Sequence, residues 1–181
     1  MKKKILVLTG SPRHEGNSDL LAQSFVAAAE KSGHDVRVFR AGRHNLTPCI
    51  ACDTCFSGGG ACSFDDEFNE LAALCEWADT LALVTPLYWF SFPAQIKAAI
   101  DKLYAFIVAG RDLPIREALL IACGGTEDMA DFDGLVRAYE LICKHSGWTD
   151  RGRLLVPGVD ARGGVQRTDA PARAAALAAT L

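Results

Sequence analysis

Apolar residues along this chain form short continuous runs that alternate with segments of helical periodicity. Lys4 to Thr9 (KILVLT) and Thr80 to Thr85 (TLALVT) are apolar runs of strand length, as expected for buried strands. Asp35 to Arg40 alternates apolar and polar positions, which is typical of a strand nearer the edge of a sheet. Ala118 to Cys123 and Arg153 to Val156 are the expected fourth and fifth strands.

Helical patterns fill the gaps between these strands. The first expected helix runs from Ser18 to Ser32 and is ended by Gly33, and the second is capped by Asp65 or Asp66 and has Phe68, Leu71 and Leu74 on one side. Two further helices are expected from Pro93 to about Phe106 and from Ala130 to His145. An Ala-rich tail from Pro171 forms a last helix or frays. This alternation predicts an α/β sandwich of three layers, with a parallel sheet between helices. Five strands fit the flavodoxin-like order 2-1-3-4-5, and residues 1–181 are expected to form a single domain.

Composition and charge narrow the choice of partners. The chain has 181 residues, of which 50% are hydrophobic, and 19 Lys+Arg against 22 Asp+Glu give a net charge of -3. This balance excludes a disordered or low-complexity chain and gives no indication of nucleic-acid binding. The apolar run after Lys2 to Lys4 is too short for a signal peptide or a membrane span, so we expect a cytoplasmic protein with no membrane partner.

The loop from Gly10 to Ser18 follows the first expected strand and opens the first helix. Free backbone N–H groups and the helix dipole favour a phosphate group there, and Arg13 adds positive charge. The loop is not a Walker A motif, because Asn17 stands where a lysine is needed. A monophosphate site is the remaining functional interpretation, and an ordinary polar turn with a helix cap is the alternative.

Two further loops follow neighbouring strands. Thr85 to Pro93 contains four aromatic residues, a flat apolar surface that suits a planar heterocycle, although a hydrophobic plug or an oligomer contact would also use such residues. Gly124 and Gly125 follow the fourth strand and allow a ligand to approach the backbone closely. Ligands of open α/β sheets bind beyond the carboxyl ends of the strands. A ligand with a phosphate tail and a planar head, such as flavin mononucleotide (FMN), fits this combination.

Three segments within about the first 105 residues resemble the NADPH-dependent FMN reductases of the flavodoxin-like superfamily, including its iron-sulfur flavoprotein branch. These segments are LTGSPRHEGNS, PCIACDTC and TPLYWFSFPAQIKAAIDKLY. The resemblance implies a homodimer or homotetramer with the helix from Pro93 to Tyr104 at an interface. It also implies an FMN site with two parts. The phosphate would lie near Ser11, Arg13, Asn17 and Ser18, and the isoalloxazine against Pro86, Leu87, Tyr88, Trp89 and Phe90, with Gly124 and Gly125 closing one side.

Four of the seven cysteines lie in one short segment, with the pattern Cys49-x2-Cys52-x2-Cys55-x6-Cys62. Thiolates at this spacing can converge on one [4Fe-4S] cluster, and the pattern resembles the compact motif of iron-sulfur flavoproteins. Reduced thiols, a disulfide and a zinc site are the alternatives, of which zinc fits least because the CxxC pairs overlap. Cys75, Cys123 and Cys143 fall in helix or strand patterns and are expected to be core residues.

The expected function is that of an FMN-dependent oxidoreductase, which takes hydride from NAD(P)H and passes electrons to a quinone, a flavin or another small-molecule or protein acceptor. We name no catalytic side chain, and we expect His14 and His44 to be loop histidines without a catalytic role. An iron-sulfur flavoprotein that transfers electrons is the alternative, and a flavodoxin-like carrier is the non-enzyme alternative. A phosphatase of the C-x5-R type is excluded, because no cysteine has an arginine six positions later.

Overall fold

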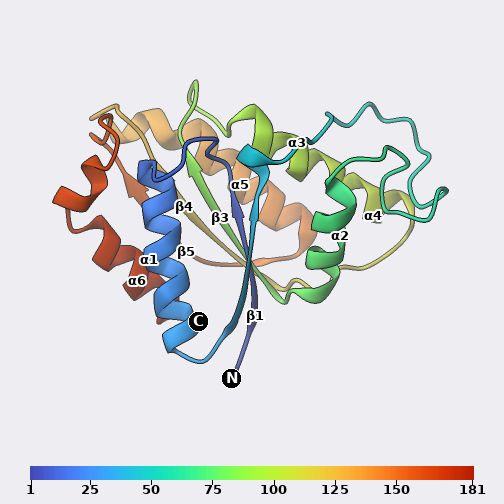
Figure 1. Cartoon of the computed structure of the whole chain (residues 1–181), viewed down its shortest axis with the longest axis horizontal. Helices are drawn as coiled ribbons and strands as arrows, with labels where there is room; N and C mark the ends of the chain where they lie inside the picture. The colour runs from blue at the N-terminus through green and yellow to red at the C-terminus, as the bar shows by residue number, and fades with distance from the viewer.

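The computed structural model describes all 181 residues and contains a five-stranded parallel sheet with the order β2-β1-β3-β4-β5 (Figure 1), which confirms the expected topology. The strands are β1 (Lys4–Thr9), β2 (Asp35–Arg40), β3 (Thr80–Pro86), β4 (Glu117–Cys123) and β5 (Thr149–Val156). In the centre of the sheet, Val7 of β1 pairs with Val38 of β2 on one side and with Ala82 of β3 on the other.

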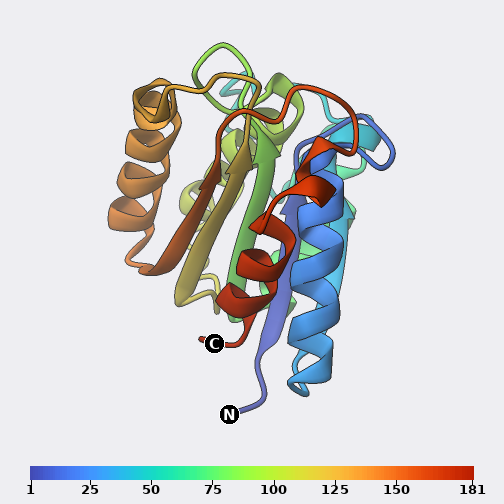
Figure 2. The same ribbon diagram turned by 90° about the vertical axis from the view of Figure 1, so that its left-hand side faces the viewer.

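Helices cover both faces of the sheet, so the molecule has three layers. The α-helices are α1 (Asn17–Lys31), α2 (Phe68–Trp77), α3 (Ala94–Lys102), α4 (Tyr104–Val108), α5 (Asp133–Ser146) and α6 (Ala170–Ala178), and the 3-10 helices are η1 (Ala41–Arg43), η2 (Met129–Phe132) and η3 (Gly164–Arg167). Helices α1 and α6 lie on one face, and α2 to α5 lie on the other (Figures 1 and 2).

Successive residues of the central strands enter two separate hydrophobic cores. In β1, Leu6 and Leu8 pack with α2 to α5, whereas Ile5 and Val7 pack with α1 and α6. This division follows from the period of two along a strand, and because both faces are covered the strand reads as continuously apolar. The three cysteines expected in the core, at positions 75, 123 and 143, are buried as predicted.

The helix expected from Pro93 to Phe106 is in fact two helices. Pro93 lies just before α3 as its N-cap, and α3 ends at Lys102. The next turn tightens, because the backbone N–H of Leu103 donates to the carbonyl oxygen of Ile100, three residues back, at 3.1 Å. α4 then begins at Tyr104. The apolar periodicity continues across this break, so the sequence pattern gives no signal for it.

Two other boundaries also differ from expectation. The helix expected from Ala130 begins as the 3-10 helix η2, and α5 starts only at Asp133. β5 begins at Thr149, four residues before the expected Arg153. The first half of β5 lies at the sheet edge and is largely solvent-exposed, so its polar residues hide the strand pattern. The tail from Pro171 forms α6, and none of the helices is both long and apolar enough to span a lipid bilayer.

Candidate functional site

Four loops meet at the carboxyl ends of the strands (Figure 2). They connect β1 to α1, β3 to α3, β4 to η2, and β5 to η3. Hydrogen bonds tie neighbouring loops to one another: the N–H of Leu87 donates to the carbonyl oxygen of Cys123 at 2.7 Å, and the N–H of Gly124 donates to that of Val156 at 3.0 Å. The predicted cofactor residues come from three of these loops and therefore lie along one edge of the sheet.

The β1–α1 loop leaves backbone donors free at the start of α1. Gly16 is the N-cap residue, and no side chain caps the helix. The Oγ of the buried Ser11 accepts a hydrogen bond from the N–H of Arg13 at 3.1 Å, which turns the loop. The first N–H groups of a helix have no partner within the helix and attract anions. This end of α1 can therefore receive a phosphate group, while the side chain of Arg13 is exposed beside it.

An ion pair fixes the shape of the same loop from outside. The buried Asp19 accepts hydrogen bonds from the N–H of Glu15 and from Nη2 of Arg43, both at 3.0 Å. Nη2 of Arg43 also donates to the carbonyl oxygen of Arg13 at 3.2 Å. Beside it, a Cβ on Gly42 would lie 2.3 Å from the backbone of Ser11, so only glycine fits there. The pair of Asp19 with Arg43 and the close approach of Gly42 thus support the backbone of the loop.

Asn17 does not direct its side chain toward a ligand, because its amide is already bonded. Nδ2 donates to the carbonyl oxygens of Val159 (2.8 Å) and Ala161 (3.0 Å), and Oδ1 accepts from the N–H of Val165 (3.1 Å). The amide therefore secures the β5–η3 loop to α1. Arg162 strengthens this contact by donating to the carbonyl oxygen of His14 at 2.6 Å. Our sequence reasoning missed this loop, and the glycines at 158, 163 and 164 after the fifth strand were the available signal.

The aromatic loop after β3 is a tight turn that presents its side chains to solvent. Tyr88 and Ser91 exchange backbone hydrogen bonds of 3.1 and 3.0 Å. The two residues between them, Trp89 and Phe90, have φ angles of +44° and +63°, a left-handed conformation that is uncommon for large side chains. Trp89 is 91% exposed and Phe90 52% exposed. A strained turn that holds two aromatic rings in water indicates a surface that another molecule covers.

The two predicted glycines fill places where a side chain would not fit without movement. A Cβ on Gly124 would lie 3.2 Å from Cβ of Leu87, and a Cβ on Gly125 would lie 3.1 Å from Cβ of Asp160. Gly124 thus brings the β4–η2 loop against the β3–α3 loop, and Gly125 brings it against the β5–η3 loop. The sequence predicts these glycines for a close approach to a ligand, whereas the close approaches that the structure shows are between loops of the chain itself.

The four predicted metal-ligating cysteines lie between η1 and α2. Cys49 and Cys52 are exposed, Cys55 and Cys62 are half-buried, and all four are free thiols. Together they line one small hollow of about 20 Å³. Burial, and then the charges of the other three sulfurs, raise the pKa of Cys55. No group of three or more His, Cys, Asp or Glu side chains is arranged so that it could hold a metal ion.

The backbone of the cysteine segment also has unusual features. Ala51, Asp53 and Phe56 have φ angles of +53°, +54° and +57°. None of the backbone N–H groups from Cys49 to Cys55 donates to another backbone group. Turns through left-handed residues can leave successive N–H groups directed toward one concave surface, an arrangement found at phosphate and iron-sulfur sites. The hydroxyl of Thr54 lies 3.1 Å from the sulfur of Cys52, and this hydrogen bond lowers the pKa of that thiol.

Among characterised proteins, the chain is similar to flavoproteins. It is 31% identical over 99 residues to an iron-sulfur flavoprotein of Methanocaldococcus jannaschii, a match that covers 55% of this chain and 51% of that protein. It is 25% identical over 161 residues to a Bacillus subtilis protein named as an NAD(P)H-dependent FMN-containing oxidoreductase, covering 86% of this chain and 85% of that one. The chain spans about half the length of the first iron-sulfur flavoproteins it matches.

Solved structures support the fold, and a family model identifies the family. The NAD(P)H:quinone oxidoreductase of Methanothermobacter marburgensis superimposes with a TM-score of 0.75 at 17% identity, over 98% of this chain and 96% of that one. The model for NADPH-dependent FMN reductases matches residues 3–135, which include β1 to β4 and the cysteine segment. The chain therefore belongs to the NADPH-dependent FMN reductase family.

Proposed function

We propose that this protein is an FMN-dependent oxidoreductase that takes hydride from NAD(P)H and passes electrons to a quinone, a flavin or another acceptor. One observation carries the proposal: the uncapped N-terminus of α1 and the exposed turn at Trp89 and Phe90 lie at the same edge of the sheet. The chemistry that FMN supplies when bound is hydride acceptance followed by electron donation. The chain itself supplies binding and orientation, and all 181 residues serve as a single FMN-binding domain.

The phosphate end of the site uses the β1–α1 loop. We assign Ser11, Arg13, Asn17 and Ser18 to it, with Arg13 as the charged side chain. Because the amide of Asn17 is bonded to the β5–η3 loop, Asn17 contributes its backbone N–H and holds the loop in place. The hydroxyl of Ser11 accepts from Arg13 through its oxygen and keeps its proton available to a phosphate oxygen.

The ring end of the site uses the β3–α3 and β4–η2 loops. We assign Pro86, Leu87, Tyr88, Trp89 and Phe90 to one side of the isoalloxazine and Gly124 and Gly125 to the other. The exposed rings exclude water from a flat ligand, and backbone N–H groups of the loops can bond its polar edge. Such hydrogen bonds shift the reduction potential of the flavin. A shift of about 30 mV corresponds to about 1.4 kcal/mol for a two-electron couple, so one hydrogen bond has a measurable effect. No acidic or basic side chain is needed for hydride transfer.

Two measurements test this function. Titration of the cofactor-free protein with FMN should quench the flavin fluorescence with a stoichiometry of one per chain. The loaded protein should then oxidise NADPH or NADH when a quinone is added. Protein that cannot be loaded with FMN would contradict the cofactor, and loaded protein that oxidises neither nucleotide with any acceptor would indicate a flavodoxin-like electron carrier.

A second candidate function, electron transfer through a [4Fe-4S] cluster beside FMN, is supported by the cysteine segment. We assign Cys49, Cys52, Cys55 and Cys62 as the ligands, because they line one hollow and because none of the backbone N–H groups from Cys49 to Cys55 donates to another backbone group. The hollow is small, so a cluster would displace the side chains that now fill it. Anaerobic purification with iron and acid-labile sulfide assays tests this: a flavin spectrum without iron would exclude the cluster.

We also propose a homodimer or homotetramer in the cytoplasm. A groove of about 550 Å³ separates α3 and α4 from α5, and Ile107 and Leu141 on its walls are 59% and 48% exposed. The groove includes the end of α3, the helix that the resemblance places at an interface, and seven free thiols suit a reducing compartment. Light scattering coupled to gel filtration tests the assembly: an Ile107→Glu variant should be monomeric if this groove is the interface.

A further inference from the structure

Two arginines from distant parts of the chain hold successive carbonyl groups of the β1–α1 loop. Nη2 of Arg43, the last residue of η1, donates to the carbonyl oxygen of Arg13 at 3.2 Å. Nη2 of Arg162 donates to the carbonyl oxygen of His14 at 2.6 Å. Because a trans peptide unit is planar, its N–H points in the direction opposite to its C=O. Arg43 therefore also fixes the direction of the N–H of His14, which donates to no other backbone group.

The same end of α1 contains a carboxylate that opposes a bound phosphate. Asp19 lies in the first turn of α1, and its side chain is only 8% exposed. The N–H groups of Asn17 and Ser18, in the same turn, donate to no backbone acceptor. A carboxylate and a phosphate are both attracted to the positive end of a helix, but they repel each other. An uncompensated charge on Asp19 would therefore weaken phosphate binding.

Arg43 compensates this charge from a partly buried position. Its Nη2 lies 3.0 Å from Oδ2 of Asp19, and its side chain is 21% exposed. Arg162 forms a comparable pair with Glu15, but at 3.6 Å and with side chains that are 62% and 76% exposed. Solvent and salt screen exposed pairs, whereas partly buried pairs are screened less. Of the two arginines, Arg43 therefore has the larger electrostatic effect on the loop.

We propose that Arg43 is a positioning residue that determines phosphate recognition at the FMN site. It holds the carbonyl group of Arg13 and neutralises Asp19, so the positive charge of Arg13 remains available to the phosphate. The inference rests on the FMN function proposed above and deepens it. Riboflavin has the ring system of FMN but no phosphate, so Arg43 should increase the affinity for FMN and leave that for riboflavin unchanged.

Removing the guanidinium group tests the preference for FMN. In Arg43→Met, the affinity for FMN should fall by about tenfold, while that for riboflavin changes by less than about twofold. Arg43→Lys keeps the charge and should recover part of the loss. Arg37→Met is the matched control, because it removes the same charge from β2, where the Arg37 guanidinium lies 4.1 Å from the ring centre of Trp77. Fluorescence titration of the cofactor-free protein with each flavin measures these affinities.

Asp19→Asn separates the charge of the pair from its hydrogen bonds. The asparagine keeps an oxygen that can accept from the N–H of Glu15 and from Arg43, but it carries no charge. The ratio of FMN affinity to riboflavin affinity should therefore rise in Asp19→Asn. The double variant Arg43→Met/Asp19→Asn should bind FMN more tightly than Arg43→Met alone. If Arg43 only helped the loop to fold, the double variant would bind FMN no better than Arg43→Met.

Inorganic phosphate provides a readout that needs no flavin. A ligand that binds the folded state raises its Tm, so phosphate should stabilise the cofactor-free wild type by a specific and a general effect. The general, kosmotropic effect of phosphate is common to all variants. The rise in Tm should therefore be smaller in Arg43→Met than in the wild type and Arg37→Met. Equal rises in these three proteins would overturn the role of Arg43 in anion binding.

The outcomes distinguish the two proposals. A wild type that binds neither flavin would contradict the FMN function, and the Tm values in phosphate would still test Arg43. Equal losses of affinity for FMN and riboflavin in Arg43→Met, or a double variant that binds FMN no better, would overturn the role of Arg43. If Arg43→Met does not fold, as judged by circular dichroism, Asp19→Asn and Arg43→Lys decide. An affinity ratio that does not rise in Asp19→Asn would then overturn it.

Discussion

Gly134, at the start of α5, lies directly against the carbonyl oxygen of Phe90 in the aromatic turn: a Cβ on this glycine would be 2.7 Å from that oxygen. The contact joins two segments that are far apart in sequence. It leaves the turn no room to move toward α5, and it places Trp89 and Phe90 at the mouth of the candidate site. Gly134 thus supports the turn although it contributes no side chain to the site.

Replacing Gly134 by alanine is expected to displace this turn. Overpacking of this kind costs about 1–3 kcal/mol when the structure cannot relax. Here an exposed turn can move, so we expect a loss of FMN affinity of about tenfold, equivalent to about 1.4 kcal/mol, with a smaller loss of stability. Fluorescence titration with FMN measures it. Gly58→Ala is the control, because a Cβ there meets nothing within 4 Å; equal affinity in the two variants would contradict the proposed support.

Trp89 is expected to lower stability while it increases cofactor binding. Its φ of +44° is unfavourable for a tryptophan, whereas asparagine tolerates the left-handed region. We expect Trp89→Asn to raise the free energy of unfolding of the cofactor-free protein by up to about 1 kcal/mol. The same variant should bind FMN more weakly. Urea unfolding and FMN titration measure the two effects, and a variant that loses stability would show that the turn is not strained.

Asn17 is expected to act through the β5–η3 loop. Asn17→Leu removes three hydrogen bonds and leaves the N–H of Val165 and the carbonyl oxygens of Val159 and Ala161 without their partner. Unsatisfied groups of this kind cost about 1–3 kcal/mol each when they stay buried, and less where water reaches them. We expect a loss of stability in this range and faster hydrogen exchange in residues 157–165. Loss of FMN affinity without faster exchange would mean that the Asn17 amide contacts the cofactor directly.

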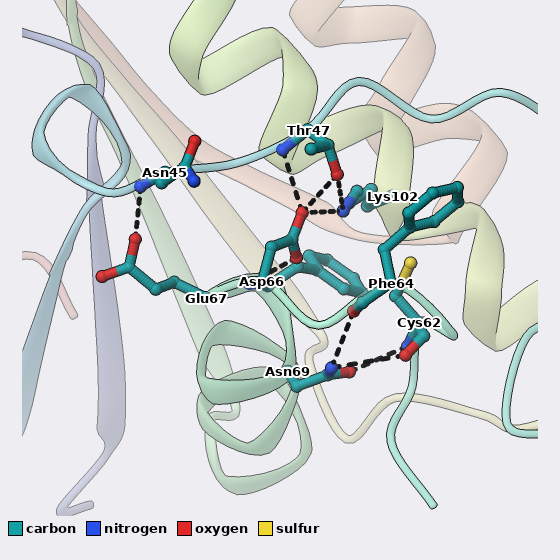
Figure 3. Close-up of polar contacts among 9 residues, drawn as sticks. Asn45, Thr47, Cys62, Phe64, Asp66, Glu67, Asn69 and Lys102 are labelled. Atoms are coloured by element: carbon teal, nitrogen blue, oxygen red, sulfur yellow. Dashed lines mark hydrogen bonds and ion pairs between the residues drawn. The ribbon is translucent and has the colours of Figure 1, made fainter. Parts of the chain in front are cut away.

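The buried ion pair between Asp66, at the base of the cysteine segment, and Lys102 of α3 (Figure 3) should weaken on acidification. The pKa of Asp66 is lower in the folded protein than its ordinary value of 3.8, so the carboxylate stabilises the fold above that value. This contribution is lost as the pH falls through the folded pKa. As the pH falls below the ordinary value of 3.8 and through the lower folded pKa, the stability of the wild type should approach that of Asp66→Asn. Urea unfolding at several pH values measures this, and a constant difference between the two proteins would contradict it.

The sheet could be predicted from the sequence because its strands carry local signals. β1 and β2 have the expected bounds, since both faces of β1 are apolar and β2 alternates at the edge. The left-handed turn at Trp89 could not be predicted, because large aromatic residues disfavour that conformation and only the surrounding structure maintains it. The ion pair between Lys102 and Asp66 could not be predicted either, because the two residues lie 36 positions apart and Lys102 reads as one position in an amphipathic helix.

The dependence of the β1–α1 loop on the β5–η3 loop has a consequence for the order of synthesis. Asn17 is translated 142 residues before Val159 and 148 residues before Val165, the partners of its amide. A chain still emerging from the ribosome can therefore form β1 to β4 while the support of the phosphate loop is missing. We expect a protein truncated before residue 159, which also loses η3 and α6 from one face of the sheet, to load FMN poorly. The amount of bound FMN would then distinguish the protein of 181 residues from the truncated one.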